Sequence, residues 1–288
     1  MTSPHERYRR PGPMTGLGRH APSLAAVADV ASLADLIHGL LLHQHWAAAY
    51  HETLTAARAA IAHRRRAQDV LDAALELDPA PLDRPRPPSR RAVGVCEHFS
   101  VLGVAALRAR GVPARARCGF GMYFEAGKGV DHWIVEYCNG DRWVAADFQI
   151  DAVQAAVLHP DFNVLDQPSG KFLRAGEAWQ GCRAGRLDPM RFGIFDEAGY
   201  WFIAHNLVRD IAALNDMEML PWDVWGLMPR PEDDISPELF ARFDHLAALA
   251  ADPDANAEEL RDAYGDPLVH VPDRVFNAVL KREEAVFG

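Results

Sequence analysis

The sequence has no apolar run that approaches the roughly 20 residues a helix needs to cross a bilayer. Its first residues are basic and contain Pro and Gly without a hydrophobic segment, so we expect no secretory signal. An excess of basic charge is also missing, because the formal net charge is −10. Binding to nucleic-acid phosphates needs a net basic face. These absences argue against a membrane protein, a secreted protein and a nucleic-acid-binding protein.

Cysteine is scarce, and the four thiols (Cys96, Cys118, Cys138 and Cys182) show no close pairing pattern. Unpaired thiols of this kind suit a reducing compartment, so we expect a cytoplasmic protein. The sequence has no internal repeat. Its 288 residues are 49% hydrophobic and 24% charged, which is typical of a soluble globular protein with one large domain or a domain with helical additions.

Cys96 is placed at the start of a predicted buried helix. An apolar run from Phe99 to Leu107 follows it, and basic residues then precede the stop signal Gly111-Val112-Pro113. Because apolar residues lie on nearly all sides, the helix is expected to be buried. A thiol in the first turn of a helix lies at the positive end of the dipole, which favours the nucleophilic thiolate.

Two segments rich in β-branched and aromatic residues follow, 132–138 and 142–148, with Asn139-Gly140 between them. Asn-Gly is a strong signal for a two-residue hairpin turn. If those two residues are the whole turn, His132 lies directly opposite Asp147, with Cβ atoms roughly 5 Å apart. A carboxylate at that distance orients a histidine as general base for a thiol.

The segment 114–124 mixes small, aromatic and charged residues and predicts a strand with a bulge at its glycines. Residues 125–131 form a glycine-containing loop that leads into His132 and could gate a substrate. The sequence therefore predicts an α+β core, with the Cys96 helix packed on an antiparallel sheet of at least three strands.

Four motifs, in order, carry a family resemblance: Gly94-x-Cys96-x-x-x-Ser100; Leu107-Arg108-x-x-Gly111-Val112-Pro113-Ala114-Arg115 with Gly119-Phe120; His132-x-x-x-Glu136; and Gly140-x-x-Trp143-x-x-x-Asp147. Over residues 90–150 the chain resembles the transglutaminase-like superfamily of papain-type cysteine enzymes. The resemblance implies the papain/transglutaminase-like fold, with Cys96 as nucleophile, His132 as base and Asp147 as the group that orients the base.

Two positions depart from that family. Trp133 directly follows His132, whereas the usual aromatic lies two residues after the histidine, and Phe148-Gln149 stands where Pro-Thr is common. Both departures bear on the substrate more than on the chemistry.

The favoured function is acyl transfer or hydrolysis at an amide or thioester carbonyl through a thioacyl-enzyme. Bacterial members of the family include proteases and enzymes that form amides from carrier-bound thioesters, so peptides, amides and carrier-protein-bound thioesters are all candidate substrates. Neither reading needs a cofactor. The alternative is a catalytically retired scaffold that binds a partner.

Candidate substrate residues lie in two places. Trp133, Tyr123 and a side chain near the linker are candidates for the second donor to an oxyanion, beside the backbone N–H of Cys96. A helix predicted from Tyr200 to Asn215 places Asn206, Arg209 and Asp210 within one turn. These polar groups form either a buried network, which we prefer, or the wall of a substrate pocket.

The remaining chain divides by composition. We expect a disordered tail at 1–22, helices at 23–78, a Pro-rich and Arg-rich solvated linker at 79–91, the core at 92–150, a loop-rich and helical extension of the same domain at 151–230, and C-terminal helices at 231–288. Ser32 is expected to cap the first N-terminal helix, and a second is expected from about 48 to 77, with a possible break near 63–66.

Four histidines in the N-terminal region, His38, His43, His45 and His51, raise the question of a metal site. Their spacings do not place them on one helical face and no acidic residue joins them, so we expect unliganded histidines. A calcium loop after Asp252 is discounted, because Ala257 replaces the required Gly. The last helix is expected from Pro272-Asp273 to Phe287, after one that begins at Ser236-Pro237.

Overall fold

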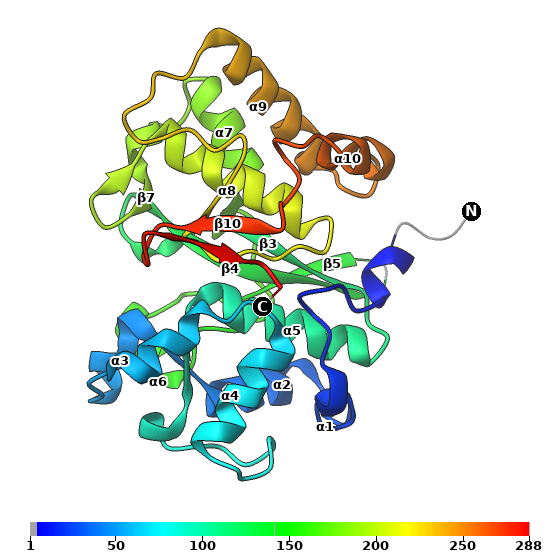
Figure 1. The fold of residues 1–288 in the computed structure, drawn as a ribbon, viewed down its shortest axis with the longest axis vertical. Helices are drawn as coiled ribbons and strands as arrows, with labels where there is room; N and C mark the ends of the chain where they lie inside the picture. Colours follow the sequence, from blue (N-terminus) through cyan, green and yellow to red (C-terminus); the bar gives the residue numbers. More distant parts are fainter. Residues whose placement is uncertain (1–4, 141, 288) are drawn as a thin grey trace. The chain divides into compact units, whose positions relative to one another are not determined.

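The computed structural model describes residues 5–140 and 142–287, which form the helices and sheets expected of an α+β protein (Figure 1). The chain divides into two compact units. Unit 1 is Met1–Ala116 with Ile134–Pro168, and unit 2 is Arg117–Trp133 with Ser169–Gly288. The predicted core at 92–150 is therefore shared between the units. Within the described residues, no helix is both long and apolar enough to cross a membrane.

Unit 1 is organised around α5 (Cys96–Ala109), which is buried from Cys96 to Arg108. Gly103 marks its contact with the sheet, because a Cβ there would lie 3.1 Å from Val135 on β4 (Lys128–Asn139). Further helical elements of the unit are η1 (Glu6–Arg9), η2 (Gly18–His20), α1 (Ala21–Ala25), α2 (Val30–Leu40), η3 (Gln44–Tyr50), α3 (Ala56–Ala59), η4 (Ala60–His63), α4 (Ala67–Leu77), η5 (Pro88–Arg90) and α6 (Ala152–Leu158). Of these, α1, α2 and α4 pack against α5.

Local signals placed the N-terminal helices only approximately. The cap of α2 is Asp29, whose carboxylate accepts from the backbone N–H of Ser32 at 2.7 Å, so Ser32 itself lies inside the first turn. The helix expected from about 48 to 77 is wrong over its first half, where short turns stand in place of one helix. Its continuous part is α4, which begins at Ala67, just beyond the expected break.

A short parallel pair of strands in unit 1 was not predicted. β1 (Leu41–His43) pairs with β2 (Ala92–Gly94), so that His43 lies beside Gly94. The Leu41-Leu42 pair extends the apolar pattern of α2, which hides the strand in the sequence. The pairing joins segments about 50 residues apart, and no local pattern encodes it.

The segment 5–22 packs on unit 1, which corrects the predicted disordered tail. Tyr8 and Met14 are fully buried. The ring of Tyr8 lies 5.2 Å from the guanidinium carbon of Arg115, which in turn pairs with Glu136 at 2.7 Å. These residues occur singly, without helical or strand period, so the sequence pattern did not indicate that they are buried.

The linker at 79–91 is also only partly solvated. Arg86 is buried, and its Nη2 donates to the carbonyl oxygens of Asp78 at 2.9 Å and Ala80 at 2.7 Å. Arg84 and Arg90 are exposed, as expected. Proline has no backbone N–H, so a proline-rich loop has few backbone donors. The Arg86 side chain supplies donors to the carbonyl oxygens of this loop instead.

Unit 2 contains a sheet with strand order β6-β3-β4-β7-β8. Strands β3 (Ala114–Glu125) and β4 continue into unit 1, where β5 (Arg142–Ala146) pairs with β4. The other strands of this sheet are β6 (Phe172–Arg174), β7 (Phe192–Ile194) and β8 (Glu197–Ala198). Strand β9 (Asp223–Val224) belongs to a separate sheet. Antiparallel β6 approaches Gly119 so closely that a Cβ there would collide with the carbonyl oxygen of Leu173.

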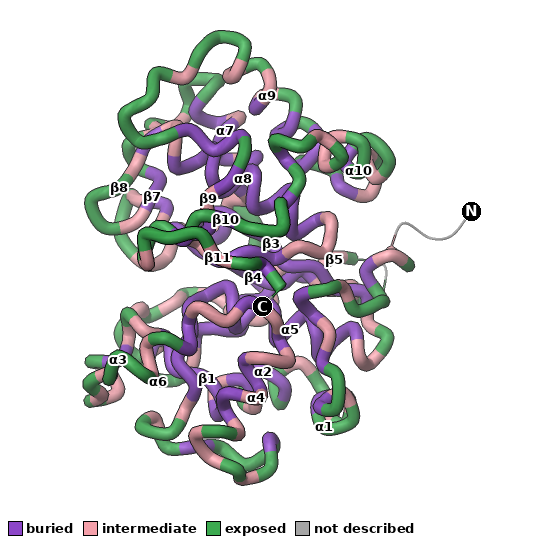
Figure 2. Tube along the Cα trace, viewed as in Figure 1, coloured by how far each residue is buried: buried purple, intermediate pink, exposed green. Residues whose placement is uncertain are grey.

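The helices of unit 2 are α7 (Ala175–Arg183), α8 (Tyr200–Ala213), α9 (Pro237–Ala251) and α10 (Ala257–Tyr264), besides the turn η6 (Pro189–Arg191). Helices α7, α8 and α9 pack against one another (Figure 1). α8 confirms the helix predicted from Tyr200 and is buried from Phe202 onward (Figure 2). Ser236 caps α9 as predicted, accepting from the N–H of Leu239 at 3.2 Å.

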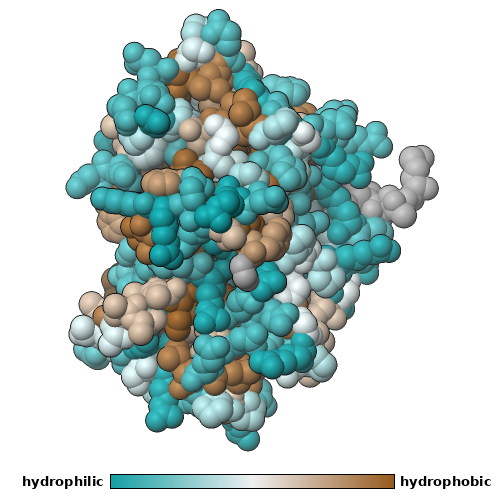
Figure 3. Space-filling view, viewed as in Figure 1, coloured by the Kyte–Doolittle hydropathy of each residue, from teal (hydrophilic) through white to brown (hydrophobic). Residues whose placement is uncertain are grey.

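The last predicted helix is wrong. Residues 272–287 instead form the hairpin of β10 (Arg274–Asn277) and β11 (Arg282–Ala285), and β10 also pairs with β9. Burial alternates along β10, with Val275 and Asn277 inside, which is the period of a strand. Hydrophilic side chains gather over this hairpin (Figure 3).

Candidate active site

Cys96 is the first residue of α5, directly after β2 and the extended residue Val95. Only 6% of its surface is exposed. The partial positive charge at the start of a long helix favours a thiolate at this position. The first N–H groups of a helix are not used by its own hydrogen-bond ladder, so they are suited to bind a developing oxyanion.

The N-terminal cap of α5 uses a histidine side chain. His98 Nδ1 accepts from the N–H of Val95 at 3.1 Å, and its Nε2 lies 2.9 Å from the carbonyl oxygen of Arg64. The ring is therefore neutral with its proton on Nε2. Burial lowers the pKa of His98 to about 4. These contacts give His98 a structural role at the start of α5.

His132 lies on β4 in unit 2 and is buried among aromatic rings. Its ring centroid is 4.7 Å from that of Phe124, 6.0 Å from that of Tyr123 and 6.4 Å from that of Phe172. Phe124 and Tyr123 fold back over Gly121, where a Cβ would come 2.6 Å from the Phe124 ring. Glycine at this position thus makes room for the aromatic rings beside the histidine.

The hairpin register between β4 and β5 corrects the predicted pairing of His132 with Asp147. Asn139 pairs with Arg142, so the two connecting residues are 140 and 141, not 139 and 140. Residue 141 lies outside the described residues. The ladder is displaced by two residues from the prediction and ends at Val135 with Ala146, one residue before Asp147.

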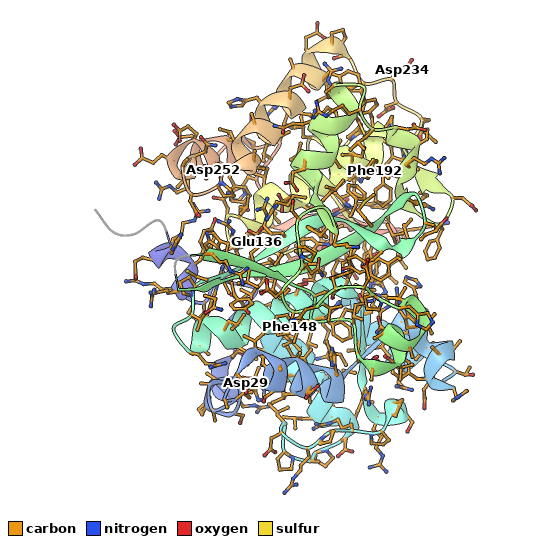
Figure 4. All side chains as sticks on the ribbon, turned by 180° about the vertical axis from the view of Figure 1, so that it is seen from behind. Asp29, Glu136, Phe148, Phe192, Asp234 and Asp252 are labelled. Carbon is orange, nitrogen blue, oxygen red and sulfur yellow. The ribbon has the colours of Figure 1, made fainter. Side chains whose placement is uncertain are left out.

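Asp147 is nevertheless buried and well ordered by hydrogen bonds of unit 1. Its Oδ1 accepts from the N–H of Gln149 at 2.8 Å, and its own N–H donates to the carbonyl oxygen of Val164 at 2.8 Å. The next residue, Phe148, is buried in unit 1 (Figure 4). Asp147 therefore begins a tight turn directly after β5, and that turn fixes its carboxylate.

Asn206 and Arg209, both predicted substrate candidates, are buried in a hydrogen-bond network of unit 2. Asn206 Nδ2 donates to Asp131 Oδ1 at 2.7 Å, and Arg209 Nη1 donates to Asn206 Oδ1 at 3.0 Å. Arg209 Nη2 donates to the carbonyl oxygen of Asp223 at 3.1 Å. Burial raises the pKa of Asp131 and lowers that of Arg209. The preferred interpretation as a structural network agrees with these contacts.

The other two substrate candidates differ in exposure. Trp133 is completely buried, and its Nε1 has no hydrogen-bond partner among the residues that the structure describes. Tyr123 is half-buried and contacts the ring of Phe124 with centroids 4.7 Å apart. Of the two, Tyr123 has surface open to a ligand.

Two residues near the proposed chemistry were not singled out for it from the sequence. Phe124 contacts His132. The strand pattern of β3, with Gly121 leaving room for the Phe124 ring, could have indicated this contact. His43 is placed beside Gly94 by the unpredicted β1–β2 ladder. Over the described ranges, no group of three or more His, Cys, Asp or Glu could hold a metal ion.

The comparison with protein families gives a match over the part of the chain that contains these residues. Residues 46–148 match the model of the transglutaminase-like superfamily. This part of the chain is a transglutaminase-like domain, as the four motifs predicted, and the match includes Cys96, His132 and Asp147. The α+β fold is of the papain/transglutaminase-like type, and the match supports a cysteine enzyme at the level of the family.

One solved structure is similar to part of the chain, a proposed cysteine protease from Cytophaga hutchinsonii. The two share 15% sequence identity with a TM-score of 0.34, over 58% of this chain. The similar region spans 44% of the other chain, less than half of its length. No curated protein matches this sequence.

Proposed function

We propose that this protein is a cysteine enzyme that acts on an amide or thioester carbonyl through a thioacyl-enzyme. The observation that carries the proposal is the position of Cys96, the first residue of a buried helix, within a stretch that matches the transglutaminase-like superfamily. His132 and Asp147, at the spacing of the family motifs, complete a Cys-His-Asp set.

The chemistry follows from these groups. His132 takes the proton of Cys96, and the sulfur adds to the carbonyl carbon, which forms a C–S bond and an oxyanion. Collapse of the oxyanion breaks the C–N bond of an amide or the C–S bond of a thioester, and the imidazolium gives its proton to the leaving group. Asp147 holds the imidazole in the tautomer that this sequence requires.

The acceptor decides the class of enzyme. Attack by water on the thioacyl-enzyme releases an acid and makes the protein a peptidase or amidase. Attack by an amine forms a new amide and makes it an acyltransferase, for which the acyl donor could be bound to a carrier protein. The partition of a preformed acyl-enzyme between water and added amines, read by mass spectrometry, measures this directly.

The test of the proposal is the pH dependence of Cys96 alkylation by iodoacetamide, read by peptide mass. We expect a reactive thiolate that titrates well below the roughly 8.5 of a free thiol, and that loses this property in His132→Ala and His132→Gln. Cys182 serves as an internal reference in the same sample, because burial raises its pKa to about 11. Cys96→Ser identifies the modified site.

A contrary result has a definite meaning. A Cys96 that reacts slowly and independently of His132 at every pH would remove the enzyme proposal. The chain would then be a transglutaminase-like scaffold without catalytic activity, and a search for a binding partner would follow. Melting temperatures of the variants separate loss of the base from loss of the fold.

A further inference from the structure

We propose that His43 is a catalytic residue that donates a hydrogen bond to the substrate carbonyl oxygen while Cys96 attacks, beside the backbone N–H of Cys96. This inference rests on the proposed function and adds the second donor of the oxyanion site. All the residues that carry it belong to unit 1.

The β1–β2 ladder places His43 at the start of α5. In this parallel pair Leu41 lies beside Ala92, Leu42 beside Val93 and His43 beside Gly94. Both strands therefore end at the same edge, and β2 is followed there by Val95 and then Cys96. Backbone hydrogen bonds thus bring His43 beside Gly94, two residues before the nucleophile, although the two strands are about 50 residues apart in the sequence.

The side chain of His43 points to the face of the ladder that carries α5. Paired residues in a ladder point to the same face of a sheet. A Cβ on Gly94 would lie 3.0 Å from Cβ of His98, in the first turn of α5. The His43 ring agrees with this direction, because its centroid is 6.3 Å from that of Phe99.

Phe99 and Cys96 are neighbours on one face of α5. Residues three apart in a helix lie on the same side, about 4.5 Å apart along the axis. The His43 ring therefore contacts a residue that lies one helical turn from Cys96 on the same face of α5. His98, also in the first turn of α5, uses both of its ring nitrogens for Val95 and Arg64 and therefore has a structural role.

The hydrogen bonds of His43 define which nitrogen carries its proton. The backbone N–H of His45 donates to His43 Nδ1 at 3.3 Å, so Nδ1 presents a lone pair and the neutral ring bears its proton on Nε2. Only 7% of His43 is exposed. A fixed N–H donor in a site shielded from water stabilises a developing oxyanion more than the same donor in solvent.

The adjacent polar side chains are less suited to this role. Gln44 Nε2 lies 3.1 Å from His45 Nε2, so the two side chains contact each other. His45 is exposed and Gln44 half-buried. His43 combines burial, direction and a defined donor, whereas its neighbours do not.

The test compares two reactions of Cys96 that differ in their need for an oxyanion donor. Acylation by p-nitrophenyl acetate passes through an oxyanion, whereas alkylation by iodoacetamide does not form one at the attacked carbon. We expect His43→Ala and His43→Phe to slow acylation of Cys96 about 100- to 1,000-fold, the usual effect of losing one such donor. Their alkylation rates should stay within about threefold of the unmodified protein, a margin far below that loss.

Two further variants sharpen the comparison. His43→Gln keeps an N–H donor and should recover at least about a tenth of the acylation rate, since the donor supplies most of the effect. His45→Ala keeps the backbone N–H that fixes the His43 tautomer and should acylate like the unmodified protein. Far-ultraviolet circular dichroism confirms that each variant is folded, and His43→Phe retains the ring packing on Phe99 if His43→Ala does not fold.

Normal acylation in folded His43→Phe would overturn the proposal, and so would an equal loss of acylation and alkylation, which would indicate a purely structural role. In both cases the unmodified protein reacts with both probes, and the proposed function stands. An unmodified protein whose Cys96 reacts with neither probe would instead overturn the proposed function, and this inference with it.

Discussion

The amide of Asn206 joins two buried charged side chains, donating to Asp131 at 2.7 Å and accepting from Arg209 at 3.0 Å. Asp131 directly precedes His132 on β4. The network thus holds the strand that carries the proposed base. It also buries a carboxylate and a guanidinium, and the Asn206 amide bridges the two.

Removal of this amide should destabilise the protein strongly. Asn206→Leu has nearly the same volume but leaves Asp131 and Arg209 without their shared partner, and we expect the free energy of unfolding to fall by about 3–5 kcal/mol. Asn215→Leu is the control, since Asn215 is half-buried and donates to a backbone group, the carbonyl oxygen of Ile211, rather than to a charged side chain. Urea denaturation measures the unfolding free energy of both variants. Small and equal losses in the two would contradict a stabilising role for the network.

Asn206→Asp should make this destabilisation depend on pH. The new carboxylate still accepts from Arg209, but it faces Asp131, whose pKa burial already raises. Two adjacent carboxylates retain a proton in the folded state that the unfolded chain has lost, so stability falls as pH rises. We expect this variant to be closer to the unmodified protein at pH 5 than at pH 8, by urea denaturation at both values.

Two bidentate Arg–Asp pairs of the chain differ in burial and should differ in energy. Arg117 donates to both carboxylate oxygens of Asp210, at 2.9 and 2.8 Å, and both side chains are at most 1% exposed. Arg142 and Asp166 have similar geometry, at 2.9 and 2.7 Å, with 59% and 43% exposed. Asp210→Ala should cost about 3–5 kcal/mol of unfolding free energy. Asp166→Ala should cost far less, because solvent screens the exposed pair.

The outcome that would count against this contrast is a comparable loss in the two alanine variants. Asp210 also accepts from the N–H of Cys118 at 3.0 Å, which adds to the cost of removing it. Asp210→Asn keeps part of that acceptor and should be less destabilising than Asp210→Ala, so the pair of variants separates the ion pair from the backbone contact.

The packing of the N-terminal segment can be tested at Tyr8. This residue is 1% exposed and contacts the ring of Trp143 with centroids 5.8 Å apart. Tyr8→Ala should lower the free energy of unfolding by about 3 kcal/mol, the lower end for a buried aromatic residue. Val157→Ala, at a position 59% exposed in the same unit, should change it by less than about 0.5 kcal/mol. A disordered tail would make the Tyr8 variant equally silent in thermal denaturation.

Two buried histidines should make stability depend on mildly acidic pH. Burial lowers the pKa of His98 to about 4 and that of His205 to about 3. Between these values and the unfolded value of about 6.5, the unfolded chain binds more protons than the folded one, so stability is lost as pH falls below about 6.5. Each histidine contributes a slope of about 1.4 kcal/mol per pH unit in that window.

The variant His98→Gln isolates one of these contributions. A glutamine can accept from the N–H of Val95 and donate to the carbonyl oxygen of Arg64, as the imidazole does, but it does not titrate. Denaturation curves between pH 4 and 7 should show a slope smaller by about one proton than in the unmodified protein. An unchanged slope would mean that His98 does not contribute.

Helix α5 shows how far local signals reach. Its start at Cys96 and its end near Gly111 were predicted, because a first-turn position, an apolar run and a glycine–proline stop all act within a few residues. Gly111 has φ +72°, the left-handed conformation that ends a helix. The same locality explains the correct start of α8 and the cap at Ser236.

Strand pairings were predicted less well than helices. The β4–β5 hairpin was recognised, but its register is displaced by two residues, since Asn139-Gly140 and the following pair of positions both suit a two-residue turn. The β1–β2 ladder was missed because it pairs segments about 50 residues apart, which no short sequence window contains. The β10–β11 hairpin is local, but Pro272-Asp273 was interpreted as the start of a helix.

The sequence by itself determined the resemblance to the transglutaminase-like superfamily, the α+β class, the buried helix that begins at Cys96, and the motif spacing of His132 and Asp147. These follow from local backbone preferences and from motif spacing. Only the tertiary structure decided the hairpin register, the packing of Tyr8, the charge network at Asn206 and the placement of His43 beside Gly94. Each of these depends on which distant groups can bury or hydrogen-bond one another, and that choice is made by the packed chain as a whole.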